Sequence, residues 1–233
     1  MSWTLVPAAR FREHLGQWSA LHAVGPASPL LAPDFVEPLL REFGTGAELL
    51  AIHGGGAAMA LVTPRGPMRW QTFQPAQAPI GLWLQADGAD QPALAASLAR
   101  ALPGFALVLG VTQCDPELVP RPADGGRAQT LDYIQTARIT VAGSFDDYWQ
   151  GRGKNLRSNL KKQRTRLERE GVALRLEVVR TPDAVAAAVA DYGRLESAGW
   201  KSGSGTAVHA DNAQGRFHRG MLEAFCARGA SSI

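Results

Sequence analysis

Short apolar runs, separated by glycine, proline and polar residues, characterise the first half of the chain. Their length and their content of β-branched and aromatic residues are typical of β-strands. The runs that predict strands are 3–6, 48–53, 57–63, 68–73, 82–84 and 105–111, the last of them buried. Apolar residues at helical spacing predict helices over 11–21, 33–43 and 92–101. The two runs on either side of Gly54-Gly55-Gly56 also predict a hairpin.

The second half of the chain has longer elements. The run 130–141 is β-branched and aromatic, and it predicts a strand that leaves one domain and reaches the next. A helix should follow as far as Gly171, or a short helix and then a longer one, because Gly151 and Gly153 interrupt its early turns. Residues 172–179 predict a further strand. Two more helices are expected over 182–199 and 211–228.

This order of elements predicts an α/β (α+β) protein with two domains, residues 1–136 and 137–233. A chain of 233 residues has room for one large or two small domains, each with its own core. The first domain should be complete and rich in antiparallel strands. The second has one clear strand and three helices, which cannot cover each other as complete layers, so we expect it to be unfinished.

The helical segment before Gly171 has two distinct faces. Apolar residues at helical steps form a stripe that should face protein, and they are Phe145, Trp149, Leu156, Leu160 and Leu167. Basic residues on a neighbouring face should meet solvent or a ligand, and they are Lys154, Arg157, Lys161 and Arg164. Ser144 stands just before two aspartates and predicts the N-cap of this segment.

Positive charge is concentrated in the same segment. Residues 152–170 contain eight basic and two acidic residues and so carry a net charge of +6, whereas the whole chain carries +3. The rest of the chain is therefore net acidic, and the partner that this pattern indicates is anionic and is met at one place. The ordinary alternative is a solvated amphipathic helix, although a solvating face normally mixes both signs of charge.

The remaining motifs indicate little chemistry. His53-Gly54-Gly55-Gly56 resembles an oxyanion-hole sequence, but no G-x-S-x-G motif follows, so a hairpin turn is the better interpretation. The loop 74–81, QPAQAPIG, lies where a phosphate-binding turn would follow a strand, yet it lacks a run of glycines and a basic residue. Trp200-Lys201 is either a core plug or a substrate contact at a loop edge. The five histidines show no paired ligand spacing, so we expect no metal.

Cysteine usage and the N-terminal residues bear on the compartment. Cys114 and Cys226 lie far apart in sequence and form no disulfide framework. The first residues contain no apolar signal region, and no stretch is long enough to cross a membrane. We therefore expect a cytoplasmic protein without a membrane span.

The segment YWQGRGKNLRSNLKKQRTRLEREG, followed by a strand, a helix and GWKSG, resembles the GNAT-superfamily acetyltransferases related to the cellulose-biosynthesis protein CelD. Their relatives include the FemAB-type aminoacyl transferases. The residues that carry the resemblance are Tyr148, Trp149, Lys154, Asn155, Leu156, Arg157, Leu160, Arg164, Leu167, Gly171, Trp200 and Lys201. The N-terminal half is similar more loosely, through Trp18, Leu21, Ser28, Pro29, Phe35, Phe43 and Gly44.

The resemblance implies a tandem GNAT-like (acyl-CoA N-acyltransferase) fold and an enzyme that moves an acyl group to an amine. The donor would be acetyl-CoA, and the acceptor a small-molecule or envelope-precursor amine in exopolysaccharide or cell-envelope biosynthesis. Such an enzyme positions the thioester, polarises its carbonyl through backbone N–H groups and needs no covalent nucleophile. The candidate substrate- or cofactor-binding residues are Lys154, Arg157, Lys161, Arg164, Trp200 and Lys201.

The resemblance also implies that further strands and a pyrophosphate-binding turn would follow Ser231-Ser232-Ile233. We therefore expect the C-terminal half to be truncated, and the chain alone to be inactive and to lack micromolar acetyl-CoA binding. Two alternatives remain: a nucleic-acid-binding protein that uses the basic helix 152–170, and a non-catalytic pseudo-acetyltransferase. Nucleic acid is the less favoured partner, because no aromatic residue is interleaved with the basic residues of 152–170.

Overall fold

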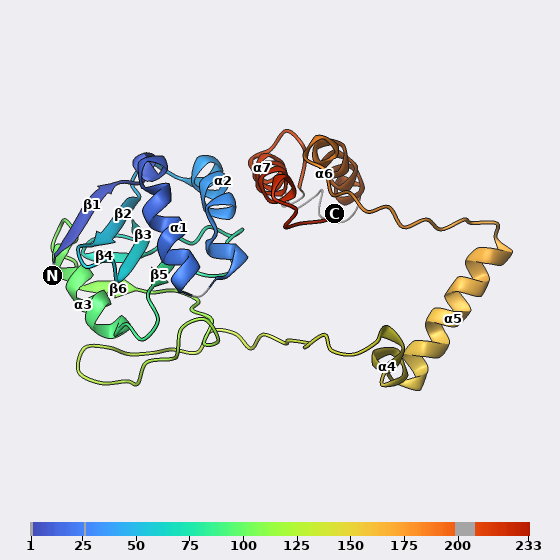
Figure 1. Cartoon of the computed structure of the whole chain (residues 1–233), viewed down its shortest axis with the longest axis horizontal. Coiled ribbons are helices and arrows are strands. Elements are labelled where there is room, and N and C mark those ends of the chain that lie inside the picture. Colours follow the sequence, from blue (N-terminus) through green and yellow to red (C-terminus); the bar gives the residue numbers. More distant parts are fainter. Residues whose placement is uncertain (1, 26, 199–207) are drawn as a thin grey trace. The chain divides into compact units, whose positions relative to one another are not determined.

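The computed structural model describes residues 2–25, 27–198 and 208–233 and shows a mixed α/β protein (Figure 1). The chain forms two compact units. The first, which we call the sheet unit, contains residues 1–132 and 179–233. The second, which we call the basic unit, contains residues 133–178.

A six-stranded sheet forms the centre of the sheet unit. Its strands are β1 (Trp3–Pro7), β2 (Leu49–His53), β3 (Ala58–Pro64), β4 (Arg69–Thr72), β5 (Trp83–Gln85) and β6 (Val108–Gly110). The strand order is β1-β2-β3-β4-β6, and β5 pairs with β3. All pairs are antiparallel except β4 and β6, which run parallel. A parallel pair needs a crossover connection, and the helix α3 (Gln91–Ala101) lies within it.

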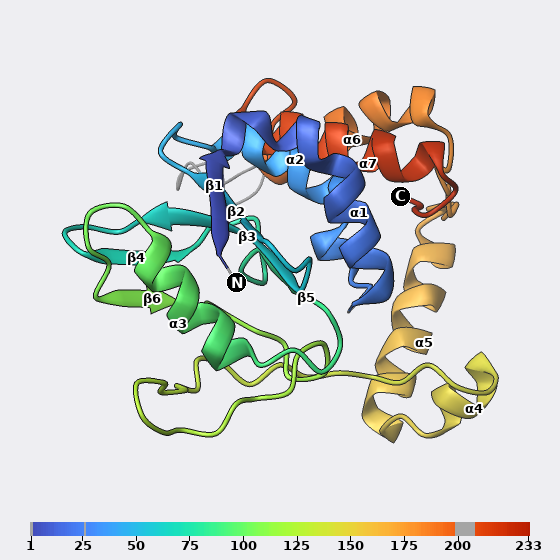
Figure 2. The same ribbon diagram turned by 60° about the vertical axis from the view of Figure 1, so that its left-hand side comes forward.

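Helices cover both faces of this sheet (Figure 2). One face is covered by the 3₁₀-helices η1 (Ala8–His14) and η2 (Pro29–Leu31) with the helices α1 (Leu15–Val24) and α2 (Pro33–Phe43). These helices pack on Leu50 and Leu61, whereas α3 packs on Ala60 and Val62 from the opposite face. Because successive residues of a strand point to opposite faces, β3 contributes to both cores.

These elements confirm the strand and helix predictions for the first half of the chain. The hairpin between β2 and β3 is also confirmed, and the Gly56 N–H donates to the His53 carbonyl in its turn at 2.9 Å. One element differs from the expectation. The run 105–111 predicts a buried strand, but only Val108–Gly110 forms β6, at one end of the strand order, and the preceding Phe105 and Leu107 are exposed.

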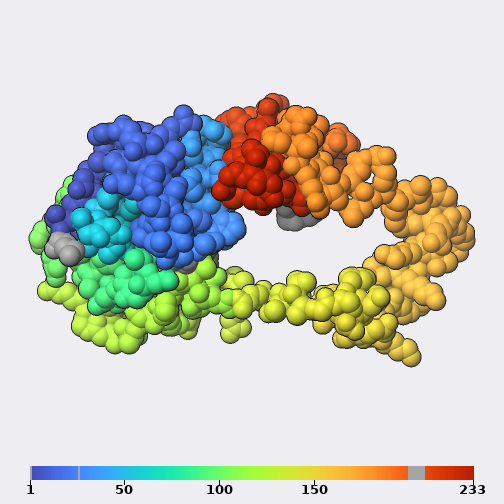
Figure 3. Space-filling model, in the orientation of Figure 1, coloured from blue at the N-terminus to red at the C-terminus, as the bar shows by residue number. Residues whose placement is uncertain are grey.

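The C-terminal helices α6 (Pro182–Ser197) and α7 (Ala213–Ala227) belong to the sheet unit. Helix α7 packs on α2, and the surfaces of the two helices meet in the space-filling view (Figure 3). The ring of Phe217 lies 5.4 Å from that of Phe35 and 5.6 Å from that of Phe43, measured between centroids. The ion pairs between the two segments are Arg216–Glu42 and Arg228–Asp34.

This packing changes the division of the chain. The expected boundary after residue 136 lies close to the observed one after residue 132, but residues 179–233 group with the sheet unit. The segment 137–233 is therefore not one compact unit in this structure. The physical reason is that Phe217, 2% exposed, is buried in an aromatic core that it shares with α2.

The basic unit contains two helices, α4 (Phe145–Gln150) and α5 (Lys154–Arg169), as the alternative of a short and a longer helix predicts. Ser144 caps α4: its hydroxyl accepts from the Asp147 N–H at 3.1 Å, and the Asp147 carboxylate accepts from the Ser144 N–H at 3.4 Å. Hydrogen bonds from Ser144 lower the pKa of Asp147. Gly171, at a φ of +69°, ends α5 in the left-handed conformation that glycine favours.

The apolar runs that flank these helices are not strands in the structure. Residues 131–142 and 172–180 have neither helical nor strand structure. The stripe is also uncovered: Phe145, Leu156 and Leu160 are 69%, 48% and 38% exposed. The prediction that this stripe faces protein is therefore wrong for this structure. For the two apolar runs, the alternation of apolar and polar residues shows which side chains would share a face of a strand. A strand forms only where the backbone N–H and C=O groups find hydrogen-bond partners.

Candidate functional site

The first place that could hold a ligand is the carboxyl end of the parallel pair β4–β6, since ligands commonly bind outside such strand ends. The Oγ1 atoms of Thr72 and Thr112 lie 2.7 Å apart there, and the Thr112 N–H donates to Thr72 Oγ1 at 3.0 Å. Gly81 occupies the remaining space, because a Cβ at this position would lie 2.2 Å from Thr72 Oγ1. The chain itself therefore fills this end of the sheet.

The loop 74–81 lies beside the same strands, and backbone N–H groups at Ala78 and Gly81 are already bonded to other carbonyls of the chain. The Ala78 N–H donates to the Pro75 carbonyl at 2.8 Å, and the Gly81 N–H donates to the Thr112 carbonyl at 3.0 Å. The two prolines of the loop have no N–H to offer. A phosphate needs several free N–H groups at such a turn, so this loop is not organised as a phosphate cradle.

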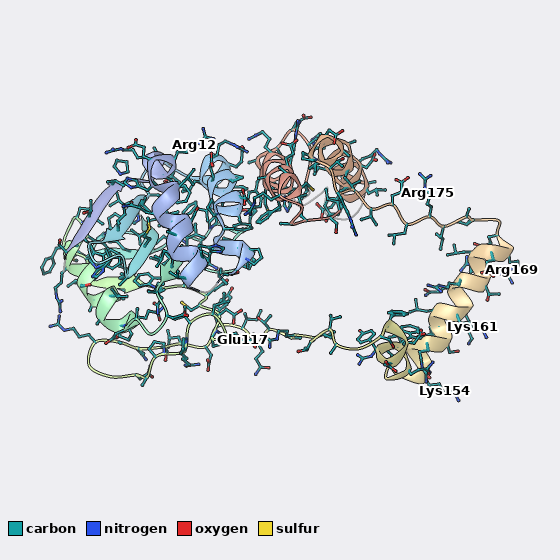
Figure 4. All side chains as sticks on the ribbon, in the orientation of Figure 1. Arg12, Glu117, Lys154, Lys161, Arg169 and Arg175 are labelled. Carbon is teal, nitrogen blue, oxygen red and sulfur yellow. The ribbon has the colours of Figure 1, made fainter. Side chains whose placement is uncertain are left out.

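The second place is α5, which carries four of the six predicted binding residues. Those with exposed side chains are Lys154, Lys161 and Arg164, and Figure 4 shows Lys154 and Lys161 projecting from the helix. Arg157 is half-buried, and its Nη1 donates to Gln150 Oε1 at 2.7 Å, so it connects α5 to α4. The other two candidates, Trp200 and Lys201, lie outside the described residues.

A different basic face of α5 forms a shallow groove of about 430 Å³. Its lining residues are Ser158, Lys161, Lys162, Thr165, Arg166 and Arg169. Only Lys161 also belongs to the predicted face. Successive lining residues are three and one sequence positions apart in turn, so they lie along one side of the helix. The same periodicity argument that identifies the apolar stripe, applied to basic and hydroxyl residues, would have found this groove.

The groove is strongly electropositive. Arg166 is paired with Glu170, Nε to Oε1, at 2.7 Å. Lys161, Lys162 and Arg169 have no acidic partner in the described part of the chain, and the hydroxyls of Ser158 and Thr165 lie among them. Unneutralised cations beside hydroxyl donors suit a phosphate or carboxylate ligand. The lining contains no carboxylate, histidine or thiol that could act as a general base.

An aromatic cluster precedes the basic helix. The rings of Phe145 and Trp149 are stacked, with centroids 5.9 Å apart and 12° between their planes. The guanidinium of Arg152 lies 4.3 Å from the centroid of the Tyr148 ring. The basic stretch 152–170 itself contains no aromatic residue, and the pattern within it therefore gave no sign of this cluster.

Residues 154–233 match the family model of an acetyltransferase (GNAT) domain. The match begins at the first residue of α5 and includes α6 and α7, so the basic groove lies inside it. No curated protein and no solved structure matches the chain at a significant level. The family match supports a GNAT-superfamily relationship for this segment and acyl transfer in general. The mixed α/β architecture fits an acyl-CoA N-acyltransferase-like fold.

Two further observations concern metals and membranes. Among the residues that the structure describes, no group of three or more histidine, cysteine, aspartate and glutamate side chains is placed to hold a metal ion. None of the described helices combines the length and the apolar character that a bilayer-spanning helix requires.

Proposed function

We propose that this chain functions in N-acyl transfer and moves an acyl group, most simply acetyl, from acyl-CoA to an amine. The observation that carries the proposal is the match of residues 154–233 to an acetyltransferase (GNAT) domain. Acyl-CoA supplies the activated thioester for such a transfer. The contribution of the α5 groove is binding, because its lining offers cations and hydroxyls but no general base or nucleophile.

The groove fits the phosphate groups of a CoA molecule. Lys161, Lys162 and Arg169 offer positive charge without an acidic partner among the described residues, and Ser158 and Thr165 add hydroxyl donors. Lysine binds phosphate as a point charge and arginine as a planar fork. Holding the phosphates orients the rest of the donor, and correct orientation accounts for much of the rate of a transfer between two bound molecules.

The finer part of the proposal concerns the acceptor. We infer from the CelD-like resemblance that it is an amine of a small molecule or an envelope precursor, in exopolysaccharide or cell-envelope biosynthesis. Lys154 and Arg164, on the face of α5 next to the groove, are the candidates for contact with an anionic part of this acceptor. Trp200 and Lys201 remain candidates for substrate contact on the basis of the sequence alone.

Phosphorus NMR of CoA titrated with the chain tests the binding step. We expect weak, salt-sensitive binding with a Kd of about 1 mM or above, because a few cations in an open groove provide mainly screened electrostatic attraction. The double variant Lys161→Ala/Lys162→Ala should lose most of this binding. The matched control, Arg65→Ala/Arg69→Ala, removes two exposed cations from the sheet unit and should keep it. An equal loss in both variants would show that the groove is not the binding place.

Transfer itself is tested by incubating the chain with acetyl-CoA and a panel of amines, with released CoA measured by liquid chromatography. An acetylated amine, formed at a lower rate by Lys161→Ala/Lys162→Ala, supports the enzyme. Binding of CoA at the groove without transfer to any amine agrees with the expectation that the chain alone is inactive, and equally with a non-catalytic pseudo-acetyltransferase.

Single-stranded nucleic acid is the second candidate ligand, and the aromatic cluster of Phe145, Tyr148 and Trp149 favours it. Phe145 and Tyr148 are exposed, and exposed rings together with basic residues are the two components of single-strand binding surfaces. Fluorescence anisotropy with a labelled oligonucleotide should then show affinity that falls steeply with salt. The variant Phe145→Ala/Trp149→Ala should weaken it by about tenfold, since one stacked base contributes about 1–3 kcal/mol, but should leave CoA binding unchanged.

A further inference from the structure

Residues 172–178, which follow α5, have the pattern of a β-strand but no partner (Figure 1). Within the described residues, the backbone groups of 173–178 make no hydrogen bond. The large apolar side chains occupy the even positions and are all exposed, namely Val172, Leu174, Leu176 and Val178. Unpaired backbone groups beside an exposed apolar face form a template for pairing with another chain.

At the end of this run, one strand edge already has a hydrogen-bonding partner. Val179 and Ile233 exchange two backbone hydrogen bonds, of 2.8 Å from the Val179 N–H and 2.9 Å from the Ile233 N–H. In a strand, the backbone groups of alternate residues point to the same edge. Odd-numbered residues of an extended 172–178 would therefore face the edge that Ile233 has begun to occupy. Even-numbered residues would present free N–H and C=O groups at the opposite edge.

We propose that this free edge pairs with the same edge of a second copy of the chain, antiparallel, with Leu176 opposite Leu176. In this register Leu174 lies opposite Val178 of the second copy, and Arg175 lies opposite Glu177. The large apolar side chains at the even positions then share one face of the ribbon, and the charged side chains share the other with Ala173. The contact is two-fold symmetric and uses the same surface on both copies, as closed dimers require.

Charge complementarity selects this register from its neighbours. The two nearest registers that keep the even residues paired place Arg175 opposite Arg175 or Glu177 opposite Glu177, and like charges directly opposite are destabilising. The proposed register makes two Arg175–Glu177 pairs. Both side chains are exposed, at 81% and 65%, and they already contact each other within one chain. Figure 4 shows Arg175 projecting from the segment that follows α5.

A two-stranded ribbon is stable only when its apolar face is covered. Helix α5 belongs to the same unit and offers a cover of matching character, the stripe of Leu156, Leu160 and Leu167. The proposal therefore accounts for two exposed apolar surfaces together.

The run 130–141 of the same chain is the competing occupant of this edge. In the sheet unit, β1 and β2 pair after two helices of similar length, α1 with 10 residues and α2 with 11. In the basic unit, α4 has 6 residues and α5 has 16. At a rise of 1.5 Å per residue, these helices are about 9 and about 24 Å long. Helix α5 is therefore too long to return the chain to the level of the run 130–141, which precedes α4. This mismatch favours a second copy of the chain as the partner of residues 172–178.

Disulfide trapping in the full chain tests the register. The exposed native thiol is removed by Cys114→Ser, and Leu176→Cys is introduced in that background. Directly opposite, hydrogen-bonded residues have Cα atoms about 5.5 Å apart, within the range that a disulfide spans, so mild oxidation should give a covalent dimer. The matched control is Leu174→Cys, which lies four residues, or roughly 13 Å, from its own copy in this register and should stay unlinked.

Charge reversal tests the pairing without a cross-link. Sedimentation velocity of the unmodified chain should show a reversible dimer. Arg175→Glu should weaken it by about tenfold, because two attractive cross-strand pairs become repulsive, and Arg175→Glu/Glu177→Arg should restore it. These side chains are exposed, so the thermal unfolding of the sheet unit should stay unchanged and serves as the folding control.

A chain that stays monomeric up to a concentration of about 100 µM, which corresponds to a dissociation free energy below about 5.5 kcal/mol, would overturn the proposal. Linking of Arg175→Cys in preference to Leu176→Cys would overturn the register. Loss of dimer in Arg175→Glu without recovery in Arg175→Glu/Glu177→Arg would overturn the role of the ion pairs.

Discussion

The sheet unit and the basic unit each contain two helices between two apolar runs of strand type. In the sheet unit the runs are β1 and β2, which pair from Trp3 opposite His53 to Pro7 opposite Leu49. The helices α1 and α2 between them cover one face of the sheet. In the basic unit the segments 133–141 and 172–178 form no strand, and α4 and α5 keep their apolar stripe exposed. The same order of elements therefore has two different outcomes.

The difference lies in what surrounds each pair of runs. Strand β2 also pairs with β3, and β3 pairs with β4 and β5, so β1 joins a sheet with a second layer on each face. The basic unit has no such neighbour among its described residues. Its helices still form, because a helix makes its hydrogen bonds within one segment, whereas a strand depends on a partner that is distant in sequence. Local sequence is thus sufficient for α5 and insufficient for the flanking strands.

The largest effect should come from Phe217→Ala, which removes the ring that joins α7 to α2. Its side chain is almost fully buried between Phe35 and Phe43, so we expect a loss of about 3–5 kcal/mol in the free energy of unfolding, measured with urea. Phe145→Ala, in the exposed cluster of the basic unit, is the control and should cost little. Similar losses at the two positions would erase the contrast between the units.

A leucine from each helix pair makes the comparison direct. Leu39 of α2 is fully buried, and Leu39→Ala should cost about 2–5 kcal/mol. Leu160 of α5 is partly exposed, and Leu160→Ala should cost less than about 1 kcal/mol at a concentration where the chain is monomeric. Urea denaturation of both variants measures this. A cost at Leu160 as large as that at Leu39 would mean that the stripe is covered within one chain.

Gly81→Ala should be moderately destabilising because it forces a methyl group into the closed end of the β4–β6 pair. The new Cβ would lie 2.2 Å from Thr72 Oγ1 and 2.5 Å from the Thr112 carbonyl oxygen. Relief of such overlaps typically costs about 1–3 kcal/mol. Gly16→Ala on α1, where no atom lies within 4 Å of the added Cβ, is the control and should be neutral or stabilising. A tolerant Gly81 would show that this end of the sheet can open.

The smallest expected effect is a change in acid stability at Glu42, whose side chain is 8% exposed. Burial raises the pKa of Glu42, but hydrogen bonds from Arg41 and Arg216 and their charges outweigh it and leave the pKa lowered. A lowered folded-state pKa stabilises the fold above the unfolded value of 4.5, and this contribution is lost as the pH falls through the folded value.

Glu42→Gln should therefore flatten the fall of stability below about pH 4.5, followed by thermal unfolding across a pH series. Arg216→Ala, which removes one of the two donors, should act in the same direction. If stability falls with pH in the same way in the wild-type protein and in both variants, the ion pair of Glu42 and Arg216 has no such role.

Sequence patterns predicted the sheet unit well because its signals are local. Gly54-Gly55-Gly56 marks a turn and Pro33 starts α2, each within a few residues. The association of α7 with α2 was not predictable in this way. It depends on contacts of Phe217 with aromatic rings that are distant in sequence, and the spacing of apolar residues along the chain does not predict such contacts.

The candidate site was predictable in part. Charge counting located α5, and helical spacing placed Lys154, Lys161 and Arg164 on one exposed face. It did not reveal the groove of Ser158, Lys162 and Thr165, because the argument followed a single face of a helix that is basic on two. Arg157 was placed on the ligand face, but in the structure it is engaged with Gln150, which only the turn between α4 and α5 brings within reach.

The packing of α7 on α2 has a consequence for how the basic unit is held. Residues 132 and 179 both belong to the sheet unit, so the basic unit is an excursion whose two ends return to the same body. Two chain connections therefore join the basic unit to that body, one at each of its ends. A protease that cuts within 172–178 would leave two fragments that still hold each other through α2 and α7. The nicked protein would run as one particle under native conditions and as two chains in denaturant, with helix α5 retained on its N-terminal piece.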